Sequence, residues 1–256
     1  MKLDKIDQRY RAPALDKGLD IIELLAVQVG GLTRAEIVKE MGKSPSEIYR
    51  MLERLVARNY VSRSLEGDRY ALTMKLFHLA ASHPPLRRLV MNAQPFMDDF
   101  SRQTLQSVHL VVADMGHAHV VAQASSRSNW EFRLRVGAML DFLHTSSGQT
   151  LLAFQDDESV AQILKAAPSG AACIAAGMAD EFATIRKNGY RVSASQQLVG
   201  VTDISVPVRS ANGATVAVLT CPFLPHFEMP ADNADNKDVP AALDILLNAA
   251  ERISKT

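Results

Sequence analysis

A run of hydroxyl and imidazole side chains, residues 144–148 (HTSSG), contains groups that could act as a nucleophile or bind an anion. A serine nucleophile often stands in a GxSxG turn, and the chain contains no such motif. The sequence also fixes no partner acid for a catalytic triad. Hydroxyls and free N–H groups at a helix start bind a carboxylate without chemistry. We therefore interpret the run as part of a ligand pocket, and a plain helix cap and a hydrolase site are the alternatives.

A second pattern, residues 116–119 (GHAH), could supply metal ligands, because histidines two positions apart on a strand share a face. A metal site needs further ligands, and no spacing in the chain provides them. We therefore expect a hairpin turn with surface histidines and no metal. Cys173 and Cys221 lie far apart without a CxxC motif, so we expect no disulfide framework. The sequence indicates no cofactor.

The segment KSPSEIYRMLERLVARNY, residues 43–60, predicts a helix with a face suited to nucleic acid. Its apolar residues recur at helical spacing and predict one buried side; they are Ile48, Met51, Leu52, Leu55 and Val56. The other side opens with small hydroxyls, an aromatic ring and an arginine, and it also carries Glu53 and Ala57, whereas a purely solvated face would favour long Glu and Lys residues. Such a side fits a helix that lies in the major groove of DNA. A solvated face on a structural three-helix unit is the alternative.

Two earlier helices complete a helix-turn-helix. One spans residues 13–28, and the other starts at a Thr33–Glu36 capping box and stops at Gly42. Only residues 42–44 separate it from the third helix, which is the length of the turn in a helix-turn-helix.

The third helix has its own start signal. Ser44 caps it, Pro45 takes its first position and Glu47 completes a second capping box. Residues 60–64 and 69–73 then predict two short strands that form a wing. Three helices and this hairpin predict a winged helix-turn-helix.

The rest of the chain predicts an α+β domain with a mostly antiparallel sheet. The expected elements are a helical connector at 74–83 broken at Pro84-Pro85, a helix at 86–103 bent or restarted at Pro95, strands at 107–115 and 117–125, a long helix near 147–155, a helix at 178–190, a hairpin at 202–222 turning at Asn212-Gly213, a mobile polar loop at 227–240 and a helix at 241–254. We therefore divide the chain into a DNA-binding domain at 1–75, a helical linker at 76–103 and a C-terminal domain at 104–256.

The charges balance overall, with 28 Lys+Arg and 28 Asp+Glu, but their distribution is uneven. Residues 1–75 hold 14 basic and 11 acidic residues, and the remainder hold 14 and 17. A mildly basic front half is a weak sign of a polyanionic partner. The N-terminus lacks the apolar core of a signal peptide, and no apolar run reaches ~18 residues. We therefore expect a cytoplasmic protein with reduced thiols and no membrane partner.

The order ALDKGLDIIELLA, GGLTRAEIVKEMGKSPSEIYRMLERLVARNYVSR and DRYALT resembles the isocitrate-lyase-regulator (IclR) family of bacterial transcription factors. RVGAMLDFLHTSSGQTLLAF, IRKNGYRVSASQQLVG and ISVPVRSANGATVAVL follow in the family's order, so the resemblance covers roughly residues 12–224. It implies a winged helix that binds double-stranded operator DNA and a GAF-like C-terminal domain that binds a small effector, often an organic acid. Family members typically form homodimers that pair into tetramers.

The exposed faces and the resemblance together define two candidate sites. For DNA binding we predict Thr33, Arg34, Ser44, Ser46, Tyr49, Arg50, Arg54, Arg63 and Arg69. For the effector we predict Leu140, Leu143, Thr145, Ser146, Ser193, Asp203 and Thr220. Glu47 stands where the family usually has a hydroxyl, and its carboxylate would repel phosphate unless the capping box uses it. Asp203 and Pro222 also depart from the family, so we expect an effector that differs from the family's small keto acids.

The sequence thus predicts a ligand-responsive transcriptional regulator, without enzymatic activity. We expect a repressor of a catabolic operon that binds an inverted-repeat operator as a homodimer or dimer of dimers and responds to an organic or aromatic acid. The alternative is a metabolite-binding protein or hydrolase whose winged helix serves protein contacts.

Overall fold

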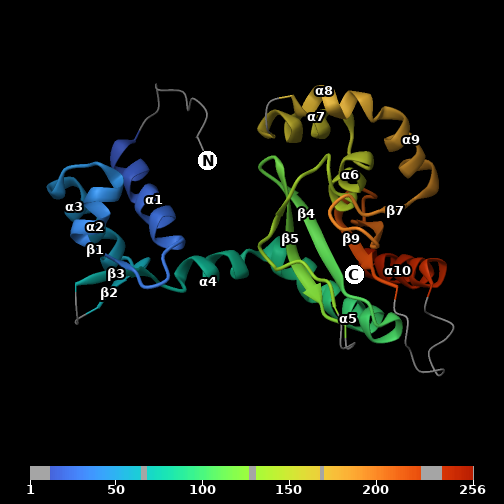
Figure 1. The fold of residues 1–256 in the computed structure, drawn as a ribbon, viewed down its shortest axis with the longest axis horizontal. Coiled ribbons are helices and arrows are strands. Elements are labelled where there is room, and N and C mark those ends of the chain that lie inside the picture. The colour runs from blue at the N-terminus through green and yellow to red at the C-terminus, as the bar shows by residue number, and fades with distance from the viewer. Residues whose placement is uncertain (1–11, 65–67, 127–130, 168–169, 226–237, 256) are drawn as a thin grey trace. The chain divides into compact units, whose positions relative to one another are not determined.

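A computed structural model of the chain describes residues 12–64, 68–126, 131–167, 170–225 and 238–255 (Figure 1). These residues form two compact units that divide between Pro84 and Pro85. That point lies within the segment that the sequence assigns to the helical linker. No helix in these ranges is both long enough and apolar enough to cross a membrane.

The N-terminal unit is a winged helix-turn-helix, as the sequence predicts. Its elements are α1 (Pro13–Ala26), β1 (Leu32–Thr33), α2 (Arg34–Met41), α3 (Pro45–Ala57), β2 (Val61–Arg63), β3 (Arg69–Leu72) and α4 (Lys75–Ser82). The predicted apolar stripe of α3 faces inward, where Ile48 and Leu52 are fully buried beside Ile21, Ile37 and Tyr70. The sequence did not predict β1, which pairs with β3 and gives the sheet the order β1-β3-β2.

Both predicted capping boxes are present at the helix starts. The Thr33 N–H donates to Glu36 Oε2 (2.7 Å), and the Glu36 N–H donates to Thr33 Oγ1 (3.3 Å). At α3, the N–H and Oγ of Ser44 donate to Glu47 Oε2 (3.3 and 2.7 Å). Gly42 ends α2 with φ +60°, a left-handed conformation that glycine adopts at low cost. The turn that places α3 is therefore fixed by local interactions on both sides.

The C-terminal unit is an α+β domain built on a six-stranded antiparallel sheet of order β6-β5-β4-β9-β8-β7. Its elements are α5 (Pro84–Thr104), β4 (Val108–Asp114), β5 (His117–Ala124), β6 (Met139–Leu140), α6 (Ser146–Ala153), α7 (Asp157–Ala166), α8 (Ala171–Gly177), α9 (Ala179–Asn188), β7 (Arg191–Ala194), β8 (Thr202–Arg209), β9 (Thr215–Phe223) and α10 (Val239–Ser254). The hairpin turns predicted at residues 115–116 and 212–213 are confirmed.

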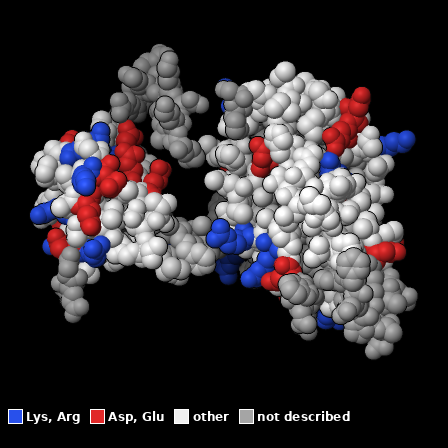
Figure 2. All heavy atoms as spheres, in the orientation of Figure 1, with Lys and Arg blue, Asp and Glu red and all other residues white. Residues whose placement is uncertain are grey.

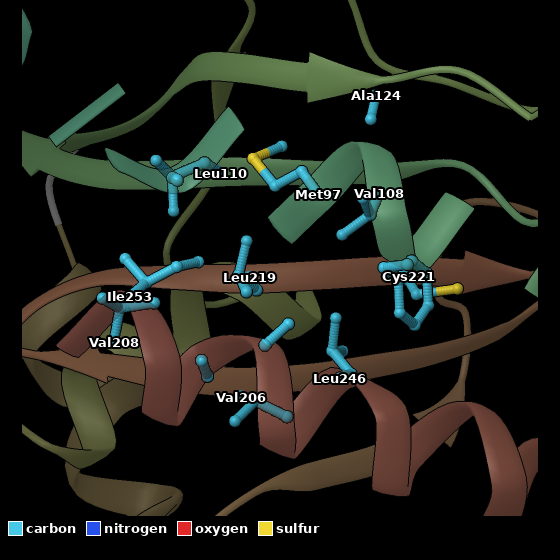
Figure 3. Packing of buried hydrophobic residues seen from close by; sticks show 14 of the residues in the cluster. Met97, Val108, Leu110, Ala124, Val206, Val208, Leu219, Cys221, Leu246 and Ile253 are labelled. Atoms are coloured by element: carbon cyan, nitrogen blue, oxygen red, sulfur yellow. The ribbon is translucent and has the colours of Figure 1, made fainter. Parts of the chain in front are cut away.

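Helices cover both faces of this sheet. Leu110 and Leu219 pack with α5 and α10 on one face, together with Met97 and Leu246 (Figure 3). Val111 and Val218, the next positions along these strands, belong to the cluster on the other face with α6 to α9. Neighbouring strand residues point to opposite faces, so each central strand contributes to two cores.

Several expected elements of this unit differ from the structure. The long helix expected near residue 150 is α6, which has eight residues. Helix α5 continues through Pro95 as one element, so the chain does not restart there. The short elements α7, α8, β6 and β7 were not predicted. Most of the expected polar loop at 227–240 lies outside the described residues.

Helix α6 lies unusually deep for so short a helix. All eight of its residues are buried, and it contacts β4, β8, β9 and α9. A Cβ on Gly148 would lie 2.4 Å from Phe142 Cα and 2.7 Å from Asp141 O. Only a residue without a side chain allows the helix to approach that backbone so closely.

A chain of buried polar groups, here called the hydroxyl chain, joins the first turn of α6 to the sheet. Its contacts are His109 Nε2 to Ser147 Oγ (3.3 Å), Ser147 Oγ to Thr220 Oγ1 (2.9 Å), Thr220 Oγ1 to Ser205 Oγ (2.9 Å) and Ser205 Oγ to Ser146 Oγ (2.8 Å). All five side chains are buried. Burial disfavours the imidazolium ion and lowers the pKa of His109 to about 4.

Gly148→Ala should destabilise the C-terminal unit by roughly 3 kcal/mol, because the added methyl meets backbone atoms that cannot move independently. Gly177→Ala is the matched control, since a Cβ there has no heavy atom within 4 Å. Denaturant unfolding followed by hydrogen exchange of β4 and β9 measures both variants. Equal stability of the two variants would contradict the close approach of α6.

Acid should destabilise the C-terminal unit through His109. Its folded pKa of about 4 lies below the unfolded value near 6.5, so the unfolded chain takes up the proton first as the pH falls. The stabilisation is complete above pH 6.5, and roughly 3 kcal/mol is lost as the pH falls to about 4. His109→Gln should lose less stability between pH 7 and pH 4 than the parent protein. Parallel pH profiles of unfolding free energy would refute this.

Candidate functional sites

Four of the nine residues predicted to bind DNA lie on α3, and the other five lie at the starts of α2 and α3 or in the wing. Arg34, Ser44, Ser46, Tyr49, Arg50, Arg54, Arg63 and Arg69 are exposed, and Thr33 is half-buried. Arg50 and Arg54 lie one turn apart on α3 and make no side-chain hydrogen bond or ion pair with any residue that the structure describes. Their guanidinium groups are therefore available to phosphates or base edges.

Arg34 and Tyr49 are held together beside this face. The Arg34 Cζ lies 5.5 Å from the centroid of the Tyr49 ring, within the range of a cation–π contact. The contact joins the start of α2 to α3. It orients one charged and one aromatic side chain on the same exposed surface.

The negative charge of Glu47 is paired within the N-terminal unit. Its carboxylate forms an ion pair with Lys17 of α1 and accepts two hydrogen bonds from Ser44. The hydrogen bonds from Lys17 and Ser44 lower the pKa of Glu47 to about 2, so the group stays ionised and paired. The capping box thus uses this carboxylate, which removes the objection that it would repel phosphate.

The two wing arginines differ from Arg50 in having internal partners. Arg63 donates to Asp68 (2.6 Å), across the tip of the hairpin. Arg69 donates to the carbonyl oxygen of Gly31 (3.0 Å) and lies 3.6 Å from the Glu36 carboxylate. Arg69 therefore ties the wing to the start of α2. In the view of Figure 2, acidic and basic residues intermix on this unit, so the free cations of α3 are a local feature.

The C-terminal unit contains a cavity of about 350 Å³ between the start of α6 and the sheet. It is lined by His109, Phe132, Leu134, Met139, Leu140, Asp141, Thr145, Ser146, Ser147, Ser195, Gln197, Leu198, Asp203, Thr220 and Pro222. Five of the seven residues predicted for the effector therefore meet around one space. The lining combines apolar walls with a floor of hydroxyl groups.

Leu143 and Ser193 do not line this cavity. Leu143 is buried in the apolar cluster around α6. Ser193 is paired with Asp203 in strand register but lies one strand nearer the sheet edge, where its hydroxyl accepts a hydrogen bond from Arg191. Both residues belong to segments that border the cavity, but their side chains are not part of its lining.

Sequence reasoning missed His109 and Ser147 among the lining residues. His109 interrupts the apolar run from Val108 to Ala113 in β4, and that was the available signal. Ser147 is adjacent to the predicted Ser146, but only the fold shows that it reaches Thr220. Phe132, Leu134 and Leu198 come from irregular segments whose direction the sequence did not indicate.

The first turn of α6 offers donors to this cavity. Thr145 Oγ1 accepts the Gly148 N–H (3.2 Å) and donates to the Asp141 carbonyl oxygen (2.6 Å), so the helix start is rigidly capped. The N–H groups of Ser146 and Ser147 have no hydrogen-bond partner within the described part of the chain. Together with the helix dipole, such groups favour an anion.

Acidic groups lie on the other sides of the cavity. Burial raises the pKa of Asp203, although Ser195 and Arg191 partly oppose this. Burial would also raise the pKa of Asp141, but hydrogen bonds from His144 and the Leu143 N–H outweigh it and lower the pKa. No Lys or Arg occurs among the lining residues that the structure describes. The cavity must therefore hold any anion with neutral donors.

The histidines of the 116–119 turn lie near each other, with His117 and His119 ring centroids 6.3 Å apart. Over the described ranges, no three His, Cys, Asp or Glu side chains form a group that could hold a metal ion. Cys173 is exposed, Cys221 is buried, and both are free thiols.

Comparison with known proteins assigns both units. A family model of the IclR helix-turn-helix domain matches residues 14–64, and one of the C-terminal domain of the bacterial transcriptional regulator IclR matches residues 86–255. The chain is 28% identical over 193 residues to the HTH-type transcriptional regulator KdgR of Escherichia coli (strain K12), which covers 73% of each protein. It is 25% identical over 212 residues to the Pca regulon regulatory protein of Pseudomonas putida, across 80% of this chain and 72% of that protein.

A solved structure shares the fold. The crystal structure of an IclR homolog complexed with 4-hydroxybenzoate, from Microbacterium hydrocarbonoxydans, aligns with a TM-score of 0.74 at 22% identity. The alignment covers 94% of this chain and 98% of that one. The C-terminal family match alone spans more than half of the chain. The protein therefore belongs to the IclR family of transcriptional regulators, with a DNA-binding helix-turn-helix and an effector-binding C-terminal domain.

Proposed function

We propose that the protein is a repressor of a catabolic operon that binds an inverted-repeat operator. A small organic acid modulates its binding to this operator. The observation that carries the DNA-binding part is the face of α3, where Arg50 and Arg54 are exposed and have no partner in the described residues. Family membership supports a regulator, and the polarity of the cavity supports an acid. The site of action is the cytoplasm.

Each residue of the α3 surface has a proposed role. Arg50 and Arg54 contact base edges or phosphates in the major groove. Ser44, Ser46 and Thr33 lie at helix starts, where hydroxyls and N–H groups bind phosphate. The Arg34–Tyr49 pair contacts the backbone beside them. Arg63 contacts it from the wing, and Arg69 mainly holds the wing in position.

Exposed apolar side chains support a homodimer. Leu15 and Leu19 of α1 are 61% and 48% exposed, and Phe77 and Leu79 of α4 are 61% and 52% exposed. Apolar groups gathered at a surface mark association sites. A twofold dimer presents two recognition helices about 34 Å apart, or a multiple of that, which requires an inverted repeat. Two such dimers can assemble into a tetramer.

The proposed effector is an acid with a single carboxylate, held at the start of α6. Phe132, Leu134 and Leu198 would contact an apolar or aromatic body, and Asp203 would accept a hydrogen bond from a hydroxyl group. A second carboxylate near Asp203 would be repelled. Because an aromatic acid is bound in the structure of the Microbacterium homolog, aromatic acids are the first class to test.

Tight binding alone would not switch the protein. The effector must favour one arrangement of the paired DNA-binding domains, and shifting a population from 1:99 to 99:1 takes about 5.5 kcal/mol of differential affinity. The covalent route for that difference runs through α4 and α5, which meet at Pro84.

The contact between His109 and Ser147 does not make a hydrolase the better proposal. Ser147 donates its proton to Thr220, so it is not poised to give it to the imidazole. Within the described residues, no carboxylate is hydrogen-bonded to His109. The pKa near 4 also makes this histidine a weak base.

Arg50→Ala should weaken operator binding by roughly 1–3 kcal/mol and relax base preference at one operator position, because it removes a base contact. Lys39→Ala is the control, since it removes one charge from the exposed side of α2 outside the proposed interface. Gel-shift titrations with DNA from beside its own gene, at several salt concentrations, compare the two. If both variants weakened operator binding equally, Arg50 would contribute only its positive charge and would make no base contact.

Ser146→Leu should abolish effector binding and leave operator binding unchanged, because the larger side chain fills the cavity. An acid found by a thermal-shift screen, followed by calorimetry, provides the readout. Leu198→Trp narrows the same cavity from its more exposed side, in case Ser146→Leu disturbs folding. Val199→Trp is the matched control, since Val199 is fully exposed and outside the lining. Full-strength binding to both cavity variants would place the effector elsewhere.

A further inference from the structure

The hydroxyl chain has a direction, which its geometry fixes at one end. Ser147 Oγ is the donor to Thr220 Oγ1 at 2.9 Å. A hydroxyl group carries one proton, so Ser147 has none left for His109. The 3.3 Å contact between Ser147 Oγ and His109 Nε2 is therefore a hydrogen bond only when Nε2 carries the imidazole proton.

The proton count of the chain then depends on the histidine tautomer. The chain has four contacts, from His109 through Ser147, Thr220 and Ser205 to Ser146. With the Nε2–H tautomer, one imidazole proton and four hydroxyl protons serve these four hydrogen bonds, so one proton is left over. With the Nδ1–H tautomer, Nε2 could accept only if Ser147 turned its proton from Thr220 to the imidazole and the other hydroxyl groups reversed with it. All four hydroxyl protons would then be used within the reversed chain.

The surplus proton must face the cavity. Ser205 is fully buried and does not line the cavity, so its proton stays within the chain. The proton of Ser147 is committed to Thr220. The remaining proton belongs to Ser146 or Thr220, and both of these side chains line the cavity. With the Nδ1–H tautomer and a reversed chain, Ser146 and Thr220 would present only oxygen lone pairs to the cavity.

We propose that His109 is a positioning residue for effector selection: its Nε2–H tautomer directs one hydroxyl proton of the chain into the cavity. This end of the cavity then selects an oxygen that accepts a hydrogen bond, from a carboxylate or a carbonyl group, over a hydroxyl or ammonium group. The inference rests on the proposed function of the cavity as the effector site. The hydroxyl donor adds to the free N–H groups of Ser146 and Ser147.

Two further observations support this role. Burial keeps the pKa of His109 near 4, so at neutral pH the ring carries a single proton whose position matters. The described lining contains no Lys or Arg. Selection by neutral donors depends on matching donors to acceptors, because a buried donor left without a partner is costly.

The test is NMR of the full-length protein labelled with ¹⁵N-histidine at pH 7. The His109 signals are those lost in His109→Gln. The expected result is a neutral ring protonated at Nε2, with a slowly exchanging proton. A ring protonated at Nδ1, or at both nitrogens, would overturn the inference.

Variants test whether the chain sets the tautomer. Thr220→Val frees the proton of Ser147 to point at the imidazole, and Ser147→Ala removes the acceptor of the imidazole proton. Both should convert the single tautomer into a mixture. Ser195→Ala is the matched control, because the Ser195 hydroxyl lines the same cavity but is not part of the hydroxyl chain. In this variant the tautomer of His109 should be unchanged. A pure Nε2–H ring in all three variants would also overturn the inference.

This experiment is independent of the effector. If the ring is protonated at Nε2 but no acid binds, the proposed function fails while the hydrogen-bond direction stands. If an acid binds but the ring is protonated at Nδ1, the proposed function stands and the role of His109 is refuted.

Discussion

The close approach of α6 to its surroundings governs the C-terminal unit. Gly148 lets the helix touch the backbone at Phe142, and all eight residues of α6 become buried. Such burial would strand the hydroxyls of the first turn without partners, which costs free energy. The hydroxyl chain satisfies them against β8, β9 and His109 of β4. The polar floor of the cavity is thus a direct result of how deeply the helix lies.

The N-terminal unit solves a different problem, which is to expose polar side chains on a precisely placed helix. The carboxylate of Glu47 lies in the first turn of α3, where it stabilises the helix start. It forms an ion pair with Lys17 and accepts a hydrogen bond from Ser44, so its charge is compensated within the unit. Among the described residues, Arg50 and Arg54 of α3 have no ion-pair partner, and neither does the half-buried Glu53 of the same helix. The two exposed arginines outnumber this acid, so the helix can attract a polyanion although the overall charge of the unit is small.

Local signals made much of this structure predictable. Capping boxes, glycine turns and apolar periodicity fixed the helices and hairpins to within a few residues, since each depends on neighbours in sequence. Two of the missed elements, β1 and β6, are two-residue strands that exist only because another strand pairs with them. The helices α7 and α8 were missed as well. The cavity was predicted only in part, because local signals place some of its residues and contacts between distant segments place the others. Thr145 and Ser146 follow from a helix start, whereas His109 joins the site through contacts that only the folded sheet creates.

One consequence concerns how such a protein can diverge. Thr220 faces the cavity, while its neighbours Leu219 and Cys221 belong to the core formed with α5 and α10. The same strand therefore serves two purposes at alternate positions. Substitutions at positions that face the cavity can change its lining while the core beneath α5 keeps its shape. The ligand preference proposed for the cavity and the packing of α5 can thus evolve separately, although only one peptide bond separates the residues responsible.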